Sequence, residues 1–296
     1  MRIDSHVHVF TQASTEFPRE ISKKRPAKRE ESAEKLLGLM DLYNVDRAVL
    51  VQTGGEELKH HAYLKHCLNA YPDRFYGIGL IPKKIASPEE HMDRLATNGR
   101  ILGFRLRHVG GPSDPFAQVD VRQLETYRIW QHAANKDYVL WLYICAADTH
   151  LVPYLVEAFP QVRVVFNHLM VCPGTETFYW DNDGRPQVDT STGFPPSHYS
   201  LLGLREYDNV CVHLSGQYAV SKEKWPYRDL IGIHERFLSK TFGANRLMWA
   251  TDFPWITENP GYKKMTLVID ELLPGLTENE RNAIMGQTAE RFLRLR

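Results

Sequence analysis

The chain has 296 residues, 43% hydrophobic and 24% charged, which is enough for one large packed core and leaves little surplus for a second domain. Lysine plus arginine equals aspartate plus glutamate at 36 each, and this zero formal net charge excludes the basic excess that a nucleic-acid partner requires. Because no apolar run approaches about 18 residues, we expect no membrane-spanning helix, and we expect no secretory leader. The four scattered cysteines form no closely spaced pair, which favours a reducing cytoplasm.

Eight short runs rich in apolar and β-branched residues predict strands. In chain order they cover residues 3–10, 47–53, 75–81, 103–107, 139–144, 162–168, 210–215 and 247–252. Amphipathic segments between them predict helices at 32–43, 56–71, 88–98, 121–136, 151–159 and 227–242. A last helix is expected at 278–293, with Thr277 as its N-cap and Glu280 three positions further on.

The alternation of strands and helices predicts an α/β fold whose parallel strands are joined by right-handed crossovers. Eight such units close into a (β/α)8 TIM barrel, so we expect residues 1–296 to form a single TIM-barrel domain; an open doubly wound sheet is the alternative. Two loops exceed ordinary connection lengths, 11–31 after the first strand and 171–207 after the sixth. The second loop suits a lid or a contact in a homo-oligomer, because it is rich in aromatic residues: Phe178, Tyr179, Trp180, Phe194 and Tyr199.

The first strand carries two histidines at the spacing of residues that share a face. Side chains two apart on a strand point the same way, so His6 and His8 project together, with Asp4 deeper on that face. The apolar residues of the strand are expected to face the helices on the other side: Ile3, Val7 and Val9. Two imidazoles at the mouth of a barrel can bind one divalent ion. The alternative is a pair of hydrogen-bonded interior histidines.

The last strand ends in a carboxylate. Met248, Ala250 and Asp252 share one face, and Asp252 lies at the carboxyl end of the strand, where it can bind the ion or take a proton from water. The alternative is an aspartate that caps the turn before Pro254.

The sixth strand ends in a histidine. His168 is expected to follow Val164 and Phe166 inward and to reach the mouth of the barrel. There it could bind metal, polarise a carbonyl group or transfer a proton. A hydrogen-bonded structural histidine is the alternative.

Strand four brings two arginines toward the interior. If Phe104 and Leu106 face the helices, Arg105 and Arg107 point inward, where a guanidinium group needs an anionic partner. That partner is either a substrate carboxylate or an internal acid such as Asp4 or Glu57. Strand seven offers His213, and strand five offers Tyr143, as weaker candidates for substrate binding.

Four motifs together resemble the amidohydrolase superfamily, in its one-domain, amidohydrolase-related branch. They are Ile-Asp-Ser-His-Val-His at 3–8, Val-Phe-Asn-His-Leu at 165–169, Leu-Met-Trp-Ala-Thr-Asp-Phe-Pro at 247–254 and Met-Gly-Gln-Thr-Ala-Glu-Arg-Phe at 285–292. Gly-Phe-Arg at 103–105 and Leu-Ser-Gly at 214–216 are similar to the sugar-lactone and pyrone-dicarboxylate lactonase group. The resemblance spans nearly the whole chain.

The resemblance implies that His6 and His8 bind a metal, that Asp252 is a ligand or the base, and that His168 is a ligand or polarises the scissile carbonyl. The implied cofactor is one divalent ion, zinc, although some members of this group work without a metal. The sequence departs from the binuclear members because strand four has no bridging lysine. It departs from the decarboxylase-like members because strand five, Trp-Leu-Tyr-Ile-Cys at 141–145, has no histidine.

These observations predict a hydrolase that cleaves a carboxylic ester, a lactone, by attack of activated water. Asp252 removes the proton, a zinc ion on His6 and His8 would lower the pKa of the water to about 7, and His168 or the ion stabilises the oxyanion. A carboxylate or sugar-derived small molecule is the expected substrate, held by the four binding candidates Arg105, Arg107, Tyr143 and His213. One alternative is non-oxidative decarboxylation of an aromatic or enoic acid at the same metal; another is a catalytically silent barrel that binds a ligand.

Overall fold

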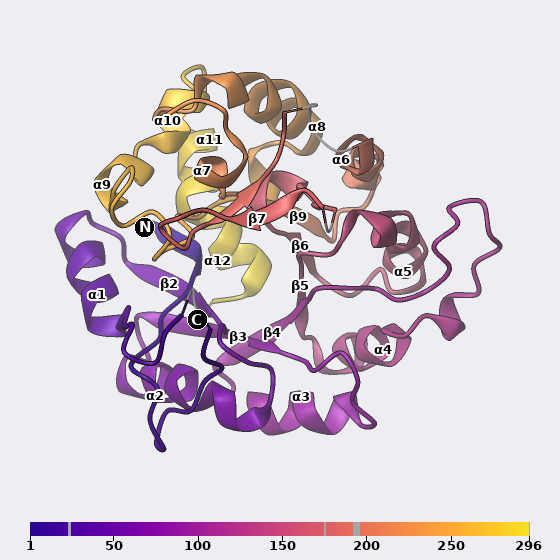
Figure 1. The fold of residues 1–296 in the computed structure, drawn as a ribbon. Coiled ribbons are helices and arrows are strands. Elements are labelled where there is room, and N and C mark those ends of the chain that lie inside the picture. The colour runs from indigo at the N-terminus through magenta and orange to yellow at the C-terminus, as the bar shows by residue number, and fades with distance from the viewer. Residues whose placement is uncertain (23–24, 175, 192–195, 296) are drawn as a thin grey trace.

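The computed structural model describes residues 1–22, 25–174, 176–191 and 196–295 (Figure 1). Eight parallel strands pair in one sheet in the order β1-β2-β3-β4-β5-β6-β9-β10. Their bounds are β1 Ile3–Val7, β2 Arg47–Val51, β3 Phe75–Leu80, β4 Ile101–Leu106, β5 Val139–Leu142, β6 Val164–Phe166, β9 Val210–Leu214 and β10 Leu247–Trp249.

The sheet is nearly closed between its two edge strands. Ser5 Oγ donates to the carbonyl of Trp249 at 2.6 Å, and the amide of Asp252 donates to the carbonyl of His6 at 3.1 Å. These bonds join β1 to the segment that starts with β10, so the fold is the predicted (β/α)8 TIM barrel rather than an open sheet.

Helices surround the ring of strands (Figure 1). Their bounds are α1 Ala33–Leu42, α2 Ala62–Ala70, α3 Pro88–Ala96, α4 Tyr127–Lys136, α5 Val152–Ala158, α6 Pro196–Leu201, α7 Gln217–Val220, α8 Lys240–Phe242, α9 Tyr262–Met265, α10 Val268–Leu272, α11 Glu278–Asn282 and α12 Thr288–Leu293. Ser32 caps α1, and Thr277 with Glu280 forms the predicted capping box at α11. None of the described helices is long and apolar enough to cross a membrane.

The buried side chains form two layers, as expected for a barrel. Inside the ring, Val49, Val51, Ile78, Trp141 and Met248 pack together, and α12 contributes Ala289 and Leu293 to the same cluster. Outside it, alternate strand residues pack against the helices; they include Leu50, Phe104, Leu106, Phe166, Leu214 and Trp249. The four cysteines are free.

A bulge in β1 overturns part of the predicted alternation. Asp4 pairs with Ala48 and Val7 with Leu50, so β1 advances by three residues while β2 advances by two. Ile3 therefore packs inside the barrel and Val7 outside it. The prediction that Asp4 shares the face of His6 is wrong. Asp4 instead accepts hydrogen bonds from Thr251 and from the hydroxyl of Tyr262.

The long segment after β6 contains an antiparallel hairpin of β7, Phe178–Trp180, and β8, Pro186–Val188. Both strands of the hairpin contribute residues to the cavity at the mouth of the barrel, among them Phe178, Trp180 and Gln187, which agrees with a lid. Tyr179 is exposed. Phe194 lies outside the described residues, and so does the side chain of Tyr199.

Candidate active site

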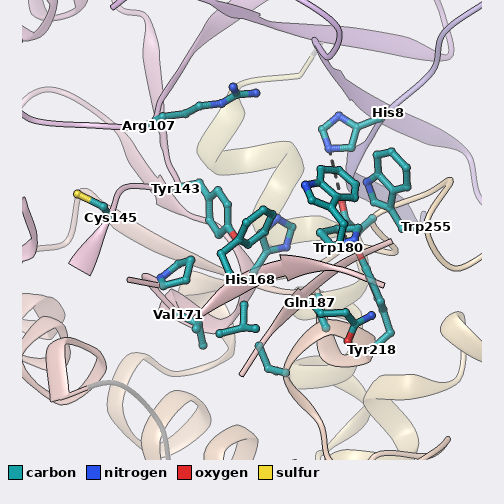
Figure 2. A pocket seen from close by; sticks show the side chains of 18 of the residues that line it. His8, Arg107, Tyr143, Cys145, His168, Val171, Trp180, Gln187, Tyr218 and Trp255 are labelled. Atoms are coloured by element: carbon teal, nitrogen blue, oxygen red, sulfur yellow. Dashed lines mark hydrogen bonds and ion pairs between the residues drawn. The ribbon is translucent and has the colours of Figure 1, made fainter. Parts of the chain in front are cut away.

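A cavity of about 480 Å³ opens where the strands end. Figure 2 shows His8, Tyr143, His168, Tyr218 and Trp255 around it. Every one of these residues lies in the segment that follows the carboxyl end of a barrel strand. The cavity is thus at the carboxyl-terminal face, the usual position of active sites in this fold.

Three of the predicted metal-binding residues lie together at the base of the cavity. Asp252 Oδ1 is 3.7 Å from His6 Nε2 and 3.5 Å from His8 Nε2. The ligand atoms of these buried residues lie within 4.8 Å of one another, so they form a candidate metal site. The ring of His168 lies beside this group, with its centroid 4.9 Å from that of His6.

His6 and His8 make different hydrogen bonds through Nδ1, and only the bond of His8 leaves Nε2 free to bind a metal. His8 Nδ1 lies 2.7 Å from the carbonyl of Val51, so Nδ1 carries the proton and Nε2 offers a lone pair. His6 Nδ1 instead accepts a hydrogen bond from the indole of Trp141 at 3.1 Å. A neutral His6 then carries its proton on Nε2, which leaves only His8 and Asp252 with free ligand atoms in this group.

Asp252 has one carboxylate oxygen held and the other free. Its backbone has a left-handed φ of 60°, and Tyr218 donates to Oδ2 at 2.6 Å. Oδ1 is buried without a hydrogen-bond partner. Burial alone would raise the pKa of Asp252, but His168, His8 and the Tyr218 hydroxyl outweigh it and hold the pKa below its usual value. Asp252 is therefore ionised at neutral pH, as a base must be.

His168 reaches the cavity by a route that the sequence did not predict. In β6 Val165 faces the interior, whereas Val164 and Phe166 face the helices, so the inward series predicted for His168 is wrong. The strand ends at Phe166, and His168 turns back to the mouth with a left-handed φ of 46°. Burial lowers the pKa of His168 to about 4, although Asp252 opposes this shift, so the ring is neutral.

His168 is held by the loop after β9. Its Nδ1 lies 3.0 Å from Ser215 Oγ. Gly216 has a φ of +74°, and a Cβ there would come within 3.0 Å of His168. His213, predicted to bind substrate, is fully buried below the cavity; its ring centroid is 5.4 Å from that of His6 and 5.2 Å from that of Trp141.

Three arginines border the cavity: Arg25, Arg105 and Arg107. Arg105 points inward, as predicted, and its guanidinium lies 4.9 Å from the ring centre of Tyr143. Burial, with Arg107 nearby, lowers the pKa of Arg105 to about 10, so it stays charged at neutral pH. Arg107 is half exposed and lies 3.7 Å from Glu56, not from Asp4 or Glu57.

Arg25 has a place in the cavity that the sequence did not predict, because it lies in the long loop after the first strand and belongs to no recognised motif. Its guanidinium binds Thr53 Oγ1, and its Nε is buried without a partner. Among the ion pairs within the described ranges, neither Arg25 nor Arg105 has a carboxylate partner. The cavity thus offers an anionic ligand two guanidinium groups, those of Arg25 and Arg105, that form no ion pair within the described residues.

The geometry agrees with the comparison with known families. The amidohydrolase family profile matches residues 3–295. The chain belongs to the amidohydrolase family. A search of curated protein sequences finds no match to this chain.

Solved structures show the same fold as this amidohydrolase. An amidohydrolase from Burkholderia multivorans with bound zinc is 19% identical, with 100% of each chain covered and a TM-score of 0.76. A probable 2-pyrone-4,6-dicarboxylic acid hydrolase from Acinetobacter baumannii with bound citric acid is 17% identical, with 99% of each chain covered and a TM-score of 0.71. A 2,6-dihydroxybenzoate decarboxylase from Rhizobium is 13% identical, covering 99% of this chain and 98% of that one, with a TM-score of 0.61.

Proposed function

We propose that the protein hydrolyses a cyclic carboxylic ester, a lactone, that carries at least one carboxylate. The observation that supports this most is the state of Asp252. The carboxyl group is ionised. Tyr218 donates a hydrogen bond to Oδ2, and Oδ1 has no hydrogen-bond partner at the base of the cavity. The arginines that border the cavity supply the charge that would bind the substrate carboxylate.

The chain's own residues account for each step. Asp252 Oδ1 takes a proton from water, and the water oxygen bonds to the lactone carbonyl carbon. Neutral His168 would donate its Nε2 hydrogen to the carbonyl oxygen if the Ser215 hydroxyl donates to Nδ1. The ring C–O bond then breaks, and the alkoxide takes the proton from Asp252, which restores the carboxylate.

A metal is not needed for this sequence of steps. The predicted zinc ion would be held by His8 and Asp252, where it would act as a Lewis acid. His6 does not present a lone pair to it in the observed hydrogen bonding, and none of the steps above depends on the ion. The cytoplasm and a homo-oligomer remain the expectations of the sequence for location and assembly.

Replacing Asp252 by asparagine tests the proposed base. The amide side chain would keep the size of the carboxylate but could not accept the proton, so we expect hydrolysis to fall by a factor of about 10² to 10⁴. The measurement is proton release from a panel of lactones with and without a carboxylate. Asp183→Asn, at an exposed carboxylate that pairs with Arg185, is the matched control. Wild-type turnover by the Asp252 variant would rule out the assigned base.

Decarboxylation is the alternative reaction, and a structural neighbour carries that activity in its name. Hydrolysis in isotopically labelled water places the label in the product carboxylate, whereas decarboxylation releases carbon dioxide from an aromatic or enoic acid without uptake of label. Release of carbon dioxide together with inactivity on every lactone would overturn the proposal.

A further inference from the structure

We infer that Trp141 is a positioning residue that fixes His6 in the tautomer with its proton on Nε2. His6 then serves as a hydrogen-bond donor beside Asp252 and is not a metal ligand. The inference rests on the proposed function for the role of Asp252 as base, but its test does not use turnover.

The indole of Trp141 determines the proton position on His6. Trp141 lies on β5 with its side chain fully buried inside the barrel. An indole N–H can only donate, and it points at His6 Nδ1 over 3.1 Å. A proton on Nδ1, in the neutral ring or in the imidazolium ion, would face this hydrogen directly. The ring therefore keeps the Nδ1 lone pair and places its proton on Nε2.

His8 shows the opposite arrangement two residues later. Its Nδ1 faces a carbonyl oxygen, that of Val51, which can only accept. The two Nε2 atoms nevertheless face the same atom, Asp252 Oδ1, at 3.7 Å for His6 and 3.5 Å for His8. The motif thus presents one donor and one lone pair to the carboxylate, where a metal site built on both histidines needs two lone pairs.

With its proton on Nε2, His6 can donate a hydrogen bond to a water molecule beside Asp252. Its buried Nε2 has no partner within hydrogen-bond distance, and neither has Asp252 Oδ1. A water molecule that accepts from Nε2–H and donates to Oδ1 would satisfy both atoms and would be held in position for attack. A metal ion bound by His6 would require the proton to move to Nδ1, against the indole.

The test is zinc binding, measured by calorimetry on chelator-treated protein, wild type against Trp141→Phe. Phenylalanine keeps most of the buried ring and removes the indole donor, which frees His6 to carry its proton on Nδ1. Because groups that orient a metal-binding histidine change affinity by about 10- to 100-fold, we expect Trp141→Phe to bind zinc at least about tenfold more tightly. Loss of packing alone would not increase affinity.

Trp249→Phe is the matched control, since Trp249 is also fully buried in a barrel strand but donates its indole hydrogen to the carbonyl of Met265. We expect it to leave zinc affinity unchanged, and we expect His8→Ala to abolish the gain in the Trp141→Phe protein. Equal or weaker zinc binding by Trp141→Phe would overturn the inference, and so would an equal gain in Trp249→Phe.

A second measurement needs no change at Trp141. Nitrogen NMR of histidine-labelled wild-type protein, with His6 assigned by comparison with His6→Gln, is expected to show the Nε2–H tautomer for His6 and the Nδ1–H tautomer for His8. An Nδ1–H tautomer at His6 would overturn the inference. Neither measurement depends on a lactone, so failure of the lactone screen and failure of this inference are separate results.

Discussion

At the scale of single residues, the arrangement around Asp252 separates its two oxygens by function. Tyr218 occupies Oδ2 with a 2.6 Å hydrogen bond, and Oδ1 is left for the chemistry. Tyr218 was not found by sequence reasoning, because it lies in the four-residue helix α7 after β9 and carries no motif of its own. Only the fold brings it to the carboxylate.

Tyr218→Phe should shift the pH dependence of hydrolysis. The Tyr218 hydroxyl lowers the pKa of Asp252, so its removal should raise that pKa, and activity should be lost at higher pH as the solution is acidified. A pH profile of kcat/KM measures this shift. Arg128→Gln, at a surface ion pair with Glu89, is the control. An acid limb that stays in place or moves to lower pH contradicts the assignment.

Arg105→Gln should weaken binding of carboxylate substrates selectively. Arg105 is buried and has no carboxylate partner among the described ion pairs, so we expect KM for a carboxylated lactone to rise by about 10- to 100-fold. Arg107→Gln is the comparison, and its effect should be smaller because that side chain is half exposed near Glu56. A neutral lactone should be affected little by either change. Equal losses for charged and neutral lactones would show that Arg105 supports the fold rather than the substrate.

At the scale of elements, the sequence predicted all eight barrel strands and placed Arg105 correctly, because β4 alternates regularly, with Phe104 and Leu106 toward the helices. It failed where alternation is interrupted. The bulge in β1 moves Asp4 off the face of His6, and β6 ends before His168. All eight predicted strands also extend one to three residues too far at their carboxyl ends, where the chain leaves the sheet and lines the cavity.

Gly216→Ala tests the packing between the β6 and β9 loops. Its φ of +74° and the 3.0 Å approach to His168 mean that a Cβ adds strain and displaces the histidine. We expect a loss of about 1 kcal/mol in the free energy of unfolding together with a lower kcat. Gly203→Ala is the control, because no heavy atom lies within 4 Å of a Cβ built there. Unchanged kcat in the Gly216 variant would contradict the placement of His168.

At the scale of the whole molecule, buried neutral histidines make stability dependent on pH. Burial lowers the pKa of His61 to about 3, of His168 to about 4 and of His234 to about 4. When the pH lies below 6.5, the ordinary pKa of histidine, each of these residues takes up a proton on unfolding. Asp4 acts in the opposite direction, because burial raises its pKa to about 7 and unfolding releases its proton. On unfolding below pH 6.5, these three histidines together take up more protons than Asp4 releases.

The free energy of unfolding should therefore fall as the pH is lowered from about 7 to about 5, by about 1.4 kcal/mol per pH unit for each net proton. Denaturant titrations at fixed pH values measure it. His66→Gln, an exposed histidine on α2, should leave the slope unchanged, whereas His234→Gln should reduce it. Stability that is constant or increases over this range would contradict the burial of these rings in the neutral form.

Two separate parts of the chain line the cavity, the ends of the barrel strands and the hairpin of β7 and β8. Asp252 and His168 lie within three residues of the end of a barrel strand, whereas Phe178, Trp180 and Gln187 come from the hairpin further along the segment between β6 and β9. The hairpin forms its own two-stranded sheet, so it can be exchanged without breaking any pairing of the eight-stranded ring. Sequence changes in the hairpin would therefore alter substrate specificity and leave the residues of the chemical step unchanged.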